Sequence, residues 1–362
     1  MTAPATTKSF ILQNSPLTAC NFDLGSPDAT FKLEAAKPIE ALKENQVLVK
    51  ILYLSNDPTQ RPWIQKGANQ DRMYAALVSE GDVMRSLGLG KVIESKSSKY
   101  TAGDYITGLL AWEEYVTVDE SRIFNKIADT SIPLTMYLDV IGLTGLTAYV
   151  GLIDVGKVTK DDTVVISAAS GATGSMCVQI AKHIIGCKRV IGISGGAEKC
   201  KYVESIGADA AVDYKDPNFK QNLQKAIGGV NTVDVYFDSV GGKILDLMLQ
   251  IVKPFGRIVA CGAIAGYNDL ELLKISNWGQ IITNRLTVTG FICSDLTDQF
   301  PKAIADISVA LKAGKVKCDA SSFTLVDLTD DKFSKIPETW SLLFSDKKGP
   351  GKLITKIAND DA

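Results

Sequence analysis

Histidine is almost absent from this 362-residue sequence, in which His183 is the only one. Cysteine occurs but is never clustered: the seven cysteines are odd in number, and no two lie closer than ten positions apart. A structural zinc site needs clustered cysteines, and a catalytic zinc site needs three nitrogen, sulfur or carboxylate ligands. The sequence therefore predicts no metal site and no disulfide framework, and its single thiols are typical of a reducing compartment. The cysteines are Cys20, Cys177, Cys187, Cys200, Cys261, Cys293 and Cys318.

An excess of charge of one sign is also missing, as is a long apolar run. The 39 basic and 41 acidic side chains leave a net charge of -2. No apolar run reaches the roughly 18 residues that span a bilayer. The first residues, MTAPATTKSF, have no basic region followed by an apolar core. We therefore expect a cytoplasmic protein that binds neither nucleic acid nor a membrane.

The chain has two parts with different sequence patterns, and its length suits two domains. Residues 8–125 show strand patterns separated by Gly, Asp and Pro, with a loop at NDPTQRPWIQKG. From about Pro133, strands and helices alternate, which predicts an α/β fold with a Rossmann-type, doubly wound parallel sheet. The tail from Ser321 to Asn359 is again strand-like. We expect a β-rich domain built from residues 1–132 with 315–362, and a cofactor-binding Rossmann domain at 133–314.

The stretch TVVISAASGATG, Thr163 to Gly174, organises the second half. A β-branched run, Val164 to Ile166, predicts a strand buried on both faces, and the small residues after it predict a tight turn into a helix. Such a turn lets a backbone approach a pyrophosphate, and the helix start offers unpaired N–H groups. The residue spacing AxxGxxG is also compatible with an ordinary strand-to-helix turn. His183 in the following helix lies outside the apolar stripe, so we expect it to be solvated and exclude His-based catalysis.

The strand RVIGIS ends where an enzyme that uses NAD would place an acidic residue against the ribose hydroxyls. Ser194, Gly195 and Gly196 stand there instead, and Lys199 and Lys201 follow. The missing acidic residue and the nearby lysines favour NADPH. The alternative is that these lysines simply form a solvated helix face.

These features resemble the medium-chain dehydrogenase/reductase superfamily. Within it, the chain resembles the zinc-independent prostaglandin and alkenal double-bond reductases, whose β-rich catalytic domain is partly barrel-like (GroES-like). The resemblance implies NADPH as cofactor, a small-molecule enone or enal as substrate, and a homodimer paired through the strand LTVTGFI. The motifs that carry it, between about Val47 and Ile357, are LSNDPTQR, LTGLTAY, AASGATGS, EKCKYVESIGADAAVDYK, YFDSVGG, FGRIVACGAIAGYN and GFI.

The resemblance also assigns cofactor-binding residues. Lys199 and Tyr214 would contact the ribose phosphate. The remaining cofactor residues that it implies are Gly171, Ala172, Thr173, Gly174, Ser239, Cys261, Gly262, Ala263, Ile264, Tyr267, Phe291, Ile292, Cys293 and Gly349. The sequence departs from the family at Thr59, where a tyrosine is usual, and at Ser239 and Gly349, where asparagines are usual. Thr59 affects the substrate pocket, because a ring is missing there.

Tyr267 is the candidate catalytic residue. Hydride addition to the β-carbon of an enone puts negative charge on the carbonyl oxygen, so the site needs a donor there. Tyr267 follows a strand end, on the side of the sheet where ligands bind, and its hydroxyl is both a donor and an acid. A packing role over the nicotinamide remains the alternative, with ribose hydroxyls or water as donors.

We expect an NADPH-dependent reductase of activated carbon–carbon double bonds in α,β-unsaturated aldehydes or ketones. The alternatives are a quinone or carbonyl reductase on the same scaffold, and a non-catalytic nucleotide-binding protein of the crystallin kind. Trp278 forms an apolar stripe with Ile275, Ile281 and Ile282. This stripe could line a substrate pocket, but a core stripe is the expected reading.

Overall fold

A computed structural model describes residues 4–360, and its contacts divide the chain into two compact units. The first unit contains the residues up to Leu138, together with Thr324–Lys348 and the chain from Leu353 onward. The second contains Asp139–Phe323 and the short segment Gly349–Lys352. The main segment of the second unit thus begins and ends later than the expected domain limits, residues 133 and 314. The chain just after 314 belongs to this unit because Lys317 N donates to Gln179 Oε1 at 2.6 Å.

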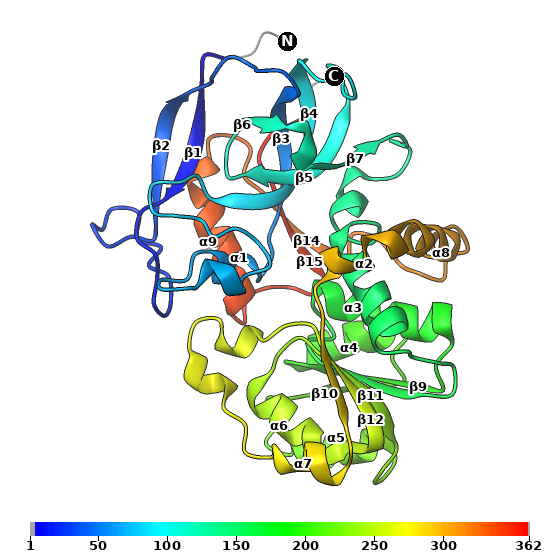
Figure 1. Ribbon diagram of the computed structural model, residues 1–362. Helices are drawn as coiled ribbons and strands as arrows, with labels where there is room; N and C mark the ends of the chain where they lie inside the picture. The colour runs from blue at the N-terminus through cyan, green and yellow to red at the C-terminus, as the bar shows by residue number, and fades with distance from the viewer. Residues whose placement is uncertain (1–3, 361–362) are drawn as a thin grey trace. The chain divides into compact units, whose positions relative to one another are not determined.

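A six-stranded parallel sheet forms the centre of the second unit (Figure 1). The strand order is β10-β9-β8-β11-β12-β13, so the winding direction reverses between β8 and β11. This is the doubly wound order, which confirms the expected α/β fold, and ligands of such sheets bind at the carboxyl ends of the strands beside the reversal. The strands are β8 (Thr163–Ile166), β9 (Arg189–Ser194), β10 (Ala210–Asp213), β11 (Val233–Asp238), β12 (Val252–Ala260) and β13 (Thr287–Gly290).

Helices cover both faces of this sheet because its central strand is apolar on both. Val164 and Ile166 pack into one core with residues of α2, α3, α4 and α8, whereas Val165 packs into another with residues of α5 and α6. All three side chains are fully buried, as the β-branched run predicts. The helices are α2 (Leu143–Val150), α3 (Ala172–Gln179), α4 (Ala197–Ser205), α5 (Phe219–Ile227), α6 (Gly242–Ile251), α7 (Gly279–Thr283) and α8 (Phe300–Lys312).

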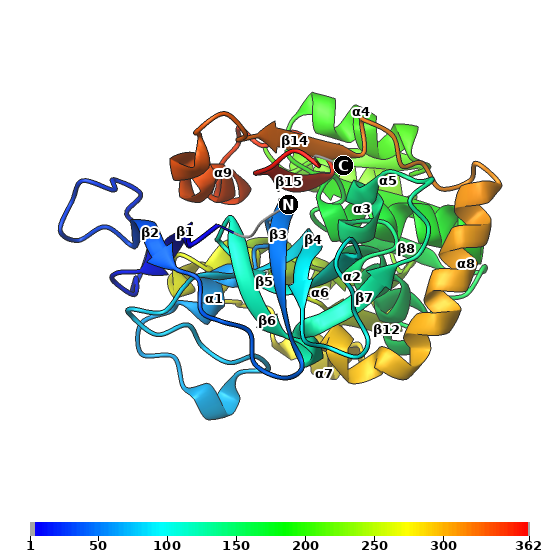
Figure 2. The same cartoon turned by 90° about the horizontal axis from the view of Figure 1, so that it is seen from above.

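The first unit is built from antiparallel strands. Its main sheet has the order β14-β15-β3-β4-β5-β7, with β6 paired to β3, and β1 pairs with β2 separately. Figure 2 shows β3, β4 and β5 side by side. Phe31, Trp112 and Trp340 form an aromatic centre, with ring centroids 4.9 to 6.1 Å apart. The strands are β1 (Thr6–Leu12), β2 (Phe31–Pro38), β3 (Gln46–Ser55), β4 (Arg85–Ser95), β5 (Tyr105–Ala111), β6 (Tyr115–Asp119), β7 (Ile123–Ile127), β14 (Phe323–Asp327) and β15 (Lys352–Lys356), and the helices are α1 (Gln60–Trp63) and α9 (Ile336–Ser341).

Two local expectations are wrong. The segment NDPTQRPWIQKG is not entirely a loop, because α1 lies within it; Pro62 is accommodated in the first turn, where its missing N–H has no intrahelical acceptor. The stripe around Trp278 is not a core stripe as a whole. Ile275 and Ile281 pack against the core, but Trp278 is 63% exposed and Ile282 is 71% exposed.

Candidate functional site

The turn after β8 brings its backbone unusually close to the start of α3. Ala168 has a positive φ of 47°, which few non-glycine residues adopt, and Gly171 N donates back to Ala168 O at 2.8 Å. A Cβ built on Gly174 would lie 2.2 Å from the same carbonyl oxygen. Only glycine at 174 therefore lets the helix pack this tightly against the turn.

The amino end of α3 is open to a ligand. Gly171 is its N-cap, and no side chain among residues 4–360 caps the helix. The first N–H groups of a helix have no partner within it, and they carry the positive end of its dipole. The backbone of Ala172, Thr173 and Gly174 therefore forms a cradle that fits a pyrophosphate.

At the end of β9, a pair of serines stands where an acidic residue would bind ribose hydroxyls. Ser194 Oγ donates to Ser170 Oγ at 2.6 Å, and both side chains are buried. A Cβ built on Gly195 would lie 2.8 Å from the ring of Tyr214, so this ring packs over the end of the strand. Tyr214 is 45% exposed, so part of this side chain is accessible from solvent.

Lys199 lies in the first turn of α4, beyond the same strand end. It is half-buried, and its amine makes no ion pair with any side chain of residues 4–360. Sequence reasoning overlooked Asp213, whose carboxylate accepts from Gly196 N at 2.8 Å and from Lys215 N at 2.9 Å. Because backbone amides satisfy this carboxylate, it does not pair with Lys199, and the lysine remains available to an anion.

A buried carboxylate shapes the loop after β11. Asp238 accepts from Tyr236 Oη at 2.8 Å and from the backbone N–H groups of Val240 and Gly241 at 3.0 Å. Burial raises the pKa of this carboxyl, although these hydrogen bonds oppose the shift. Ser239 is held beside it, since its N–H donates to Ser167 Oγ at 2.9 Å. The predicted cofactor residue Ser239 is thus tied directly to the glycine turn.

The loop after β12 carries the next predicted residues. Cys261 N and Gly262 N donate to Asp238 O at 2.8 and 3.1 Å, which fastens this loop to the end of β11. A Cβ built on Gly262 would lie 3.5 Å from Tyr267 Oη and 3.4 Å from Ser239 O. Ala263 and Ile264 complete the turn, and Tyr267 ends the short helix Ile264–Gly266. The Tyr267 hydroxyl therefore lies at the carboxyl ends of the strands, beside Ser239.

Phe291, Ile292 and Cys293 follow β13 at the same edge. The ring of Phe291 packs edge-on against Phe237, with centroids 6.4 Å apart, and Cys293 is buried. Two of the three side chains thus point into the core, which leaves the backbone of this segment as its ligand-facing part.

Gly349 lies near the glycine turn although it is far from it in the sequence. Gly351, two residues after Gly349, donates its N–H to Ser170 O at 2.8 Å. In the second unit, the predicted cofactor residues thus lie at the carboxyl ends of the strands of the parallel sheet.

His183 does not take part in this site. Its Nε2 lies 3.2 Å from Ile206 O, and the ring is half-buried against Gly207. The expectation of a solvated position is therefore wrong in detail, because the ring packs at the end of α4. Residues 4–360 contain no group of three His, Cys, Asp or Glu side chains that could hold a metal ion.

In the first unit, a phenol stands beside the position where the family's tyrosine is replaced. The hydroxyls of Thr59 and Tyr74 are hydrogen-bonded, and Trp63 Nε1 donates to the same Tyr74 oxygen at 3.4 Å. Tyr74 is 49% exposed. Sequence reasoning overlooked this residue, because it lies in a segment with no motif.

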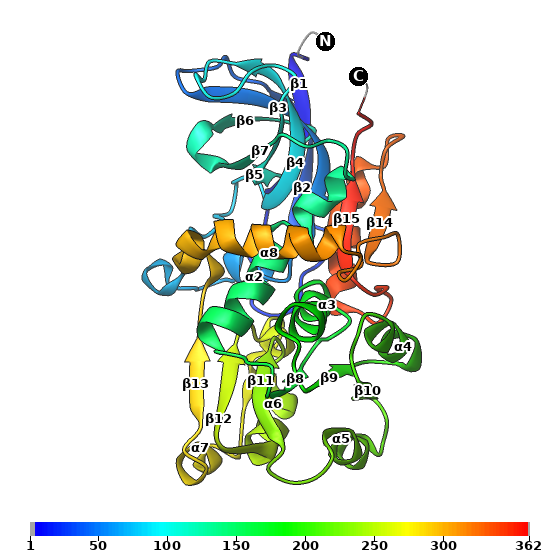
Figure 3. The same cartoon turned by 90° about the vertical axis from the view of Figure 1, so that its right-hand side faces the viewer.

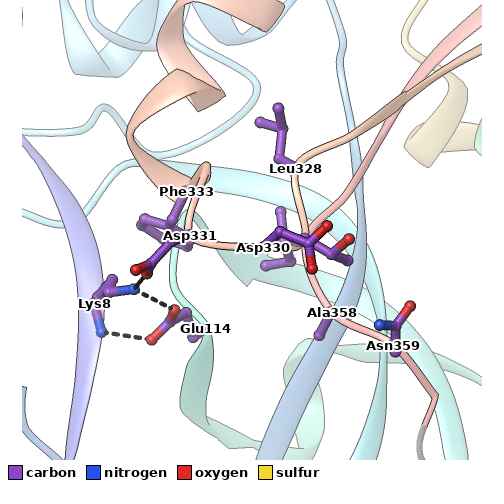
Figure 4. Close-up of a pocket in the computed structure, with 10 residues that line it drawn as sticks. Lys8, Glu114, Leu328, Asp330, Asp331, Phe333, Ala358 and Asn359 are labelled. Carbon is purple, nitrogen blue, oxygen red and sulfur yellow. Dashed lines mark hydrogen bonds and ion pairs between the residues drawn. The ribbon is translucent and has the colours of Figure 1, made fainter.

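A hollow of about 230 Å³ in the first unit holds none of the predicted residues (Figure 4). Lys8 lines it on one side and pairs with Asp331 at 2.9 Å and with Glu114 at 3.3 Å. The hydrogen bond that Lys8 donates to the Asp331 carboxylate raises the pKa of this lysine. These charges satisfy one another, so the hollow shows no group prepared for chemistry.

Comparison with known proteins gives two family matches and several close relatives. The family described as "Zinc-binding dehydrogenase" matches residues 172–308, and "N-terminal domain of oxidoreductase" matches residues 21–126. A protein of Saccharomyces cerevisiae described as an uncharacterized membrane protein is 37% identical over 98% of this chain and 99% of its own length. Within residues 4–360 we find no helix with the length and apolar character to cross a membrane.

Two further similarities concern reductases. The 2-alkenal reductase (NADP(+)-dependent) of Nicotiana tabacum is 36% identical over 81% of this chain and 83% of its own length. The crystal structure of CurA from Vibrio vulnificus in complex with NADPH superposes with a TM-score of 0.85 and 28% identity, covering 97% of this chain and 99% of that one. With the strand order and the glycine turn, these matches show that the chain belongs to the zinc-independent branch of the medium-chain dehydrogenase/reductase family.

Proposed function

We propose that this chain reduces the activated C=C bond of α,β-unsaturated aldehydes or ketones. It is an NADPH-dependent oxidoreductase of its family. One relative is named as a 2-alkenal reductase and another as a curcumin reductase, which supports an enone as substrate. The observation that carries the proposal is the hydroxyl of Tyr267 at the cofactor edge of the sheet, beside Gly262 and Ser239.

The residues at this edge fit NADPH. Gly171 to Gly174 offer the close backbone approach and the open helix start that the pyrophosphate needs. Tyr214 and Lys199 are the residues expected at the ribose phosphate, and they offer a partly exposed ring and an amine that makes no ion pair with residues 4–360. The segments after β11, β12 and β13 lie where the nicotinamide half would bind. When bound, NADPH supplies the hydride that reduces the β-carbon of the substrate.

The contribution of the chain is to stabilise charge and to provide a proton. Reduction at the β-carbon moves negative charge to the carbonyl oxygen, and a hydrogen bond from the Tyr267 hydroxyl would stabilise it. The α-carbon then takes up a proton, which the same hydroxyl or water can supply. His183 lies in the helical segment Ile180–Ile185 that follows α3, with its Nε2 at 3.2 Å from Ile206 O, so no histidine competes for this role.

The test is a product analysis. Purified protein and NADPH are incubated with a panel of enals, enones and quinones, and products are identified by mass spectrometry and NMR. We expect saturated aldehydes or ketones, formed in equal amount to the NADPH consumed. Allylic alcohols from enals, or hydroquinones alone, would indicate the carbonyl or quinone reductase instead. NADPH binding without turnover of any panel member would indicate a non-catalytic protein.

A further inference from the structure

The short segment Gly349–Lys352, which we call the strap, pairs with the glycine turn. Gly351 N donates to Ser170 O at 2.8 Å, and Gly351 forms a parallel bridge with Gly171. Lys352 N donates to Ser322 O at 3.2 Å, so the strap is fixed on its other side as well. The chain belongs to the first unit immediately before and after these residues. The strap is thus a four-residue segment that belongs to the second unit and contacts the glycine turn.

Gly351 can hold this place only because it has no side chain. Its φ is +74°, and a Cβ built on it would lie 1.8 Å from Ser322 O and 2.4 Å from Ser322 C. These neighbours are backbone atoms, which cannot rotate away as a flexible side chain would. A larger residue must therefore displace the strap from Ser170.

Ser170 is the point at which three parts of the second unit meet. Its hydroxyl accepts from Ser194 Oγ at 2.6 Å, while its carbonyl accepts from Gly351. On one side of it, Ala169 N donates to Ile193 O at 3.0 Å, so β9 holds the turn there. On the other side, Gly171 begins α3 and the pyrophosphate cradle. The strap therefore contacts the turn directly before the helix start.

We propose that Gly351 is a positioning residue, and that the strap holds the glycine turn in the conformation that receives the pyrophosphate of the cofactor. The strap acts on the part of the cofactor that NADPH and NADH share. Loosening it weakens both cofactors by the same factor and leaves the chemical step intact. The inference rests on cofactor binding at the glycine turn and is independent of whether the substrate is an enone.

The first experiment compares Gly351→Ala with Gly186→Ala. Gly186 has a φ of +77° and nothing within 4 Å of a built Cβ, so this control introduces the same backbone strain without the collision. Cofactor affinity is measured by titration of nicotinamide fluorescence. For Gly351→Ala we expect the Kd of NADPH and of NADH to rise together by about ten-fold, the scale of one lost hydrogen bond. We expect kcat at saturating NADPH to stay within about two-fold, and Gly186→Ala to keep the parental Kd.

Hydrogen exchange of the parental protein gives a second readout that needs no variant to fold. NADPH should slow exchange in the strap as well as in the turn at residues 167–174. An unchanged Kd in a folded Gly351→Ala, a loss confined to NADPH, or protection of the turn without the strap would overturn the proposal. A parental protein that binds NADPH but reduces no enone would overturn the proposed reaction. The affinity and hydrogen-exchange measurements would still test the role of the strap.

Discussion

Lys199 is the side chain on which cofactor choice is expected to depend. Its amine lies in the first turn of α4 without a carboxylate partner among residues 4–360, and no acidic residue ends β9. We expect Lys199→Ala to weaken NADPH binding by about 1 to 3 kcal/mol, the range for a lost charged hydrogen bond. NADH, which has no ribose phosphate, should bind nearly unchanged. Calorimetric titration of both cofactors measures the difference.

Lys201 supplies the control for this prediction. It lies on the same helix and is exposed, so Lys201→Ala removes an equal charge from a solvated face. Its effect on NADPH should be small, since exposed charges interact weakly through water. Equal losses of NADPH and NADH in the Lys199 variant would contradict the assignment.

Tyr267 is the side chain on which turnover is expected to depend. Its hydroxyl lies beside Gly262 and Ser239, at the carboxyl ends of the strands. Removing one oxyanion donor or general acid lowers turnover by about ten- to a thousand-fold. We expect Tyr267→Phe to lower kcat within this range, with the Kd of NADPH little changed. Steady-state kinetics with one enone at saturating NADPH provides the measurement.

Tyr214→Phe is the matched comparison, because it removes a phenol at the expected ribose phosphate. It should raise the KM for NADPH and leave kcat nearly intact. If Tyr267→Phe turned over at the parental rate, only a packing role for the ring would remain.

Single residues were predictable where local sequence restricts them. Gly174 follows from the turn spacing, and its built Cβ collides with Ala168 O. Asp213 and Tyr74 were not predictable in this way. Asp213 accepts from the backbone amides of Gly196, in the earlier loop after β9, and of Lys215, two residues further on. Tyr74 bonds to Thr59 and Trp63, so both positions depend on pairing between separate segments. A carboxylate in a sequence does not reveal whether a backbone amide satisfies it.

At the scale of elements, periodicity predicted the strands and helices of the second unit well. RVIGIS coincides with β9, because β-branching is a local property of the sequence. The strap was not predictable, since its pairing joins residues far apart in the chain and only the folded backbone shows it. The exposed part of the stripe at Trp278 was misread because periodicity identifies an apolar face without showing what covers it.

We propose that β13 pairs with the β13 of a second copy across a two-fold axis. It lies at the edge of the sheet beside β12 (Figure 3), and all four of its residues are exposed. An open edge offers unpaired N–H and C=O groups, and the exposed Trp278, Ile282 and Val288 add apolar surface in the same stretch of chain. We expect light scattering at micromolar concentration to give twice the mass of one chain. Val288→Asp should shift the mass toward that of one chain.

Val309→Asp is the control for the dimer, because Val309 is an exposed valine on α8 of the same unit. It should leave the mass unchanged, since a charge on a solvated helix face costs little. A parental mass equal to one chain would contradict the proposed pairing.

For the molecule as a whole, burial governs the chemistry of all seven cysteines. All are free thiols within the described residues, and burial raises the pKa of each. The values are about 11 for Cys20, Cys200 and Cys293, and about 12 for Cys187, Cys261 and Cys318, while Cys177 is also raised. The thiolate is the form that attacks an electrophile. An enzyme that handles enals would thereby resist alkylation by its own substrates.

This protection predicts a specific pH dependence of alkylation. Because the folded pKa values lie above the ordinary thiol pKa of 9.0, the thiolate population at pH 7.5 should be at least about a hundred-fold below that of a free thiol. The population rises about ten-fold per pH unit up to the pKa, so adduct formation by a small enal should accelerate about a hundred-fold between pH 7.5 and 9.5. Mass spectrometry of the folded protein follows each cysteine, and the urea-unfolded chain serves as the reference. A cysteine that reacted at pH 7.5 as fast in the folded protein as in the unfolded chain would show that its thiol is not protected.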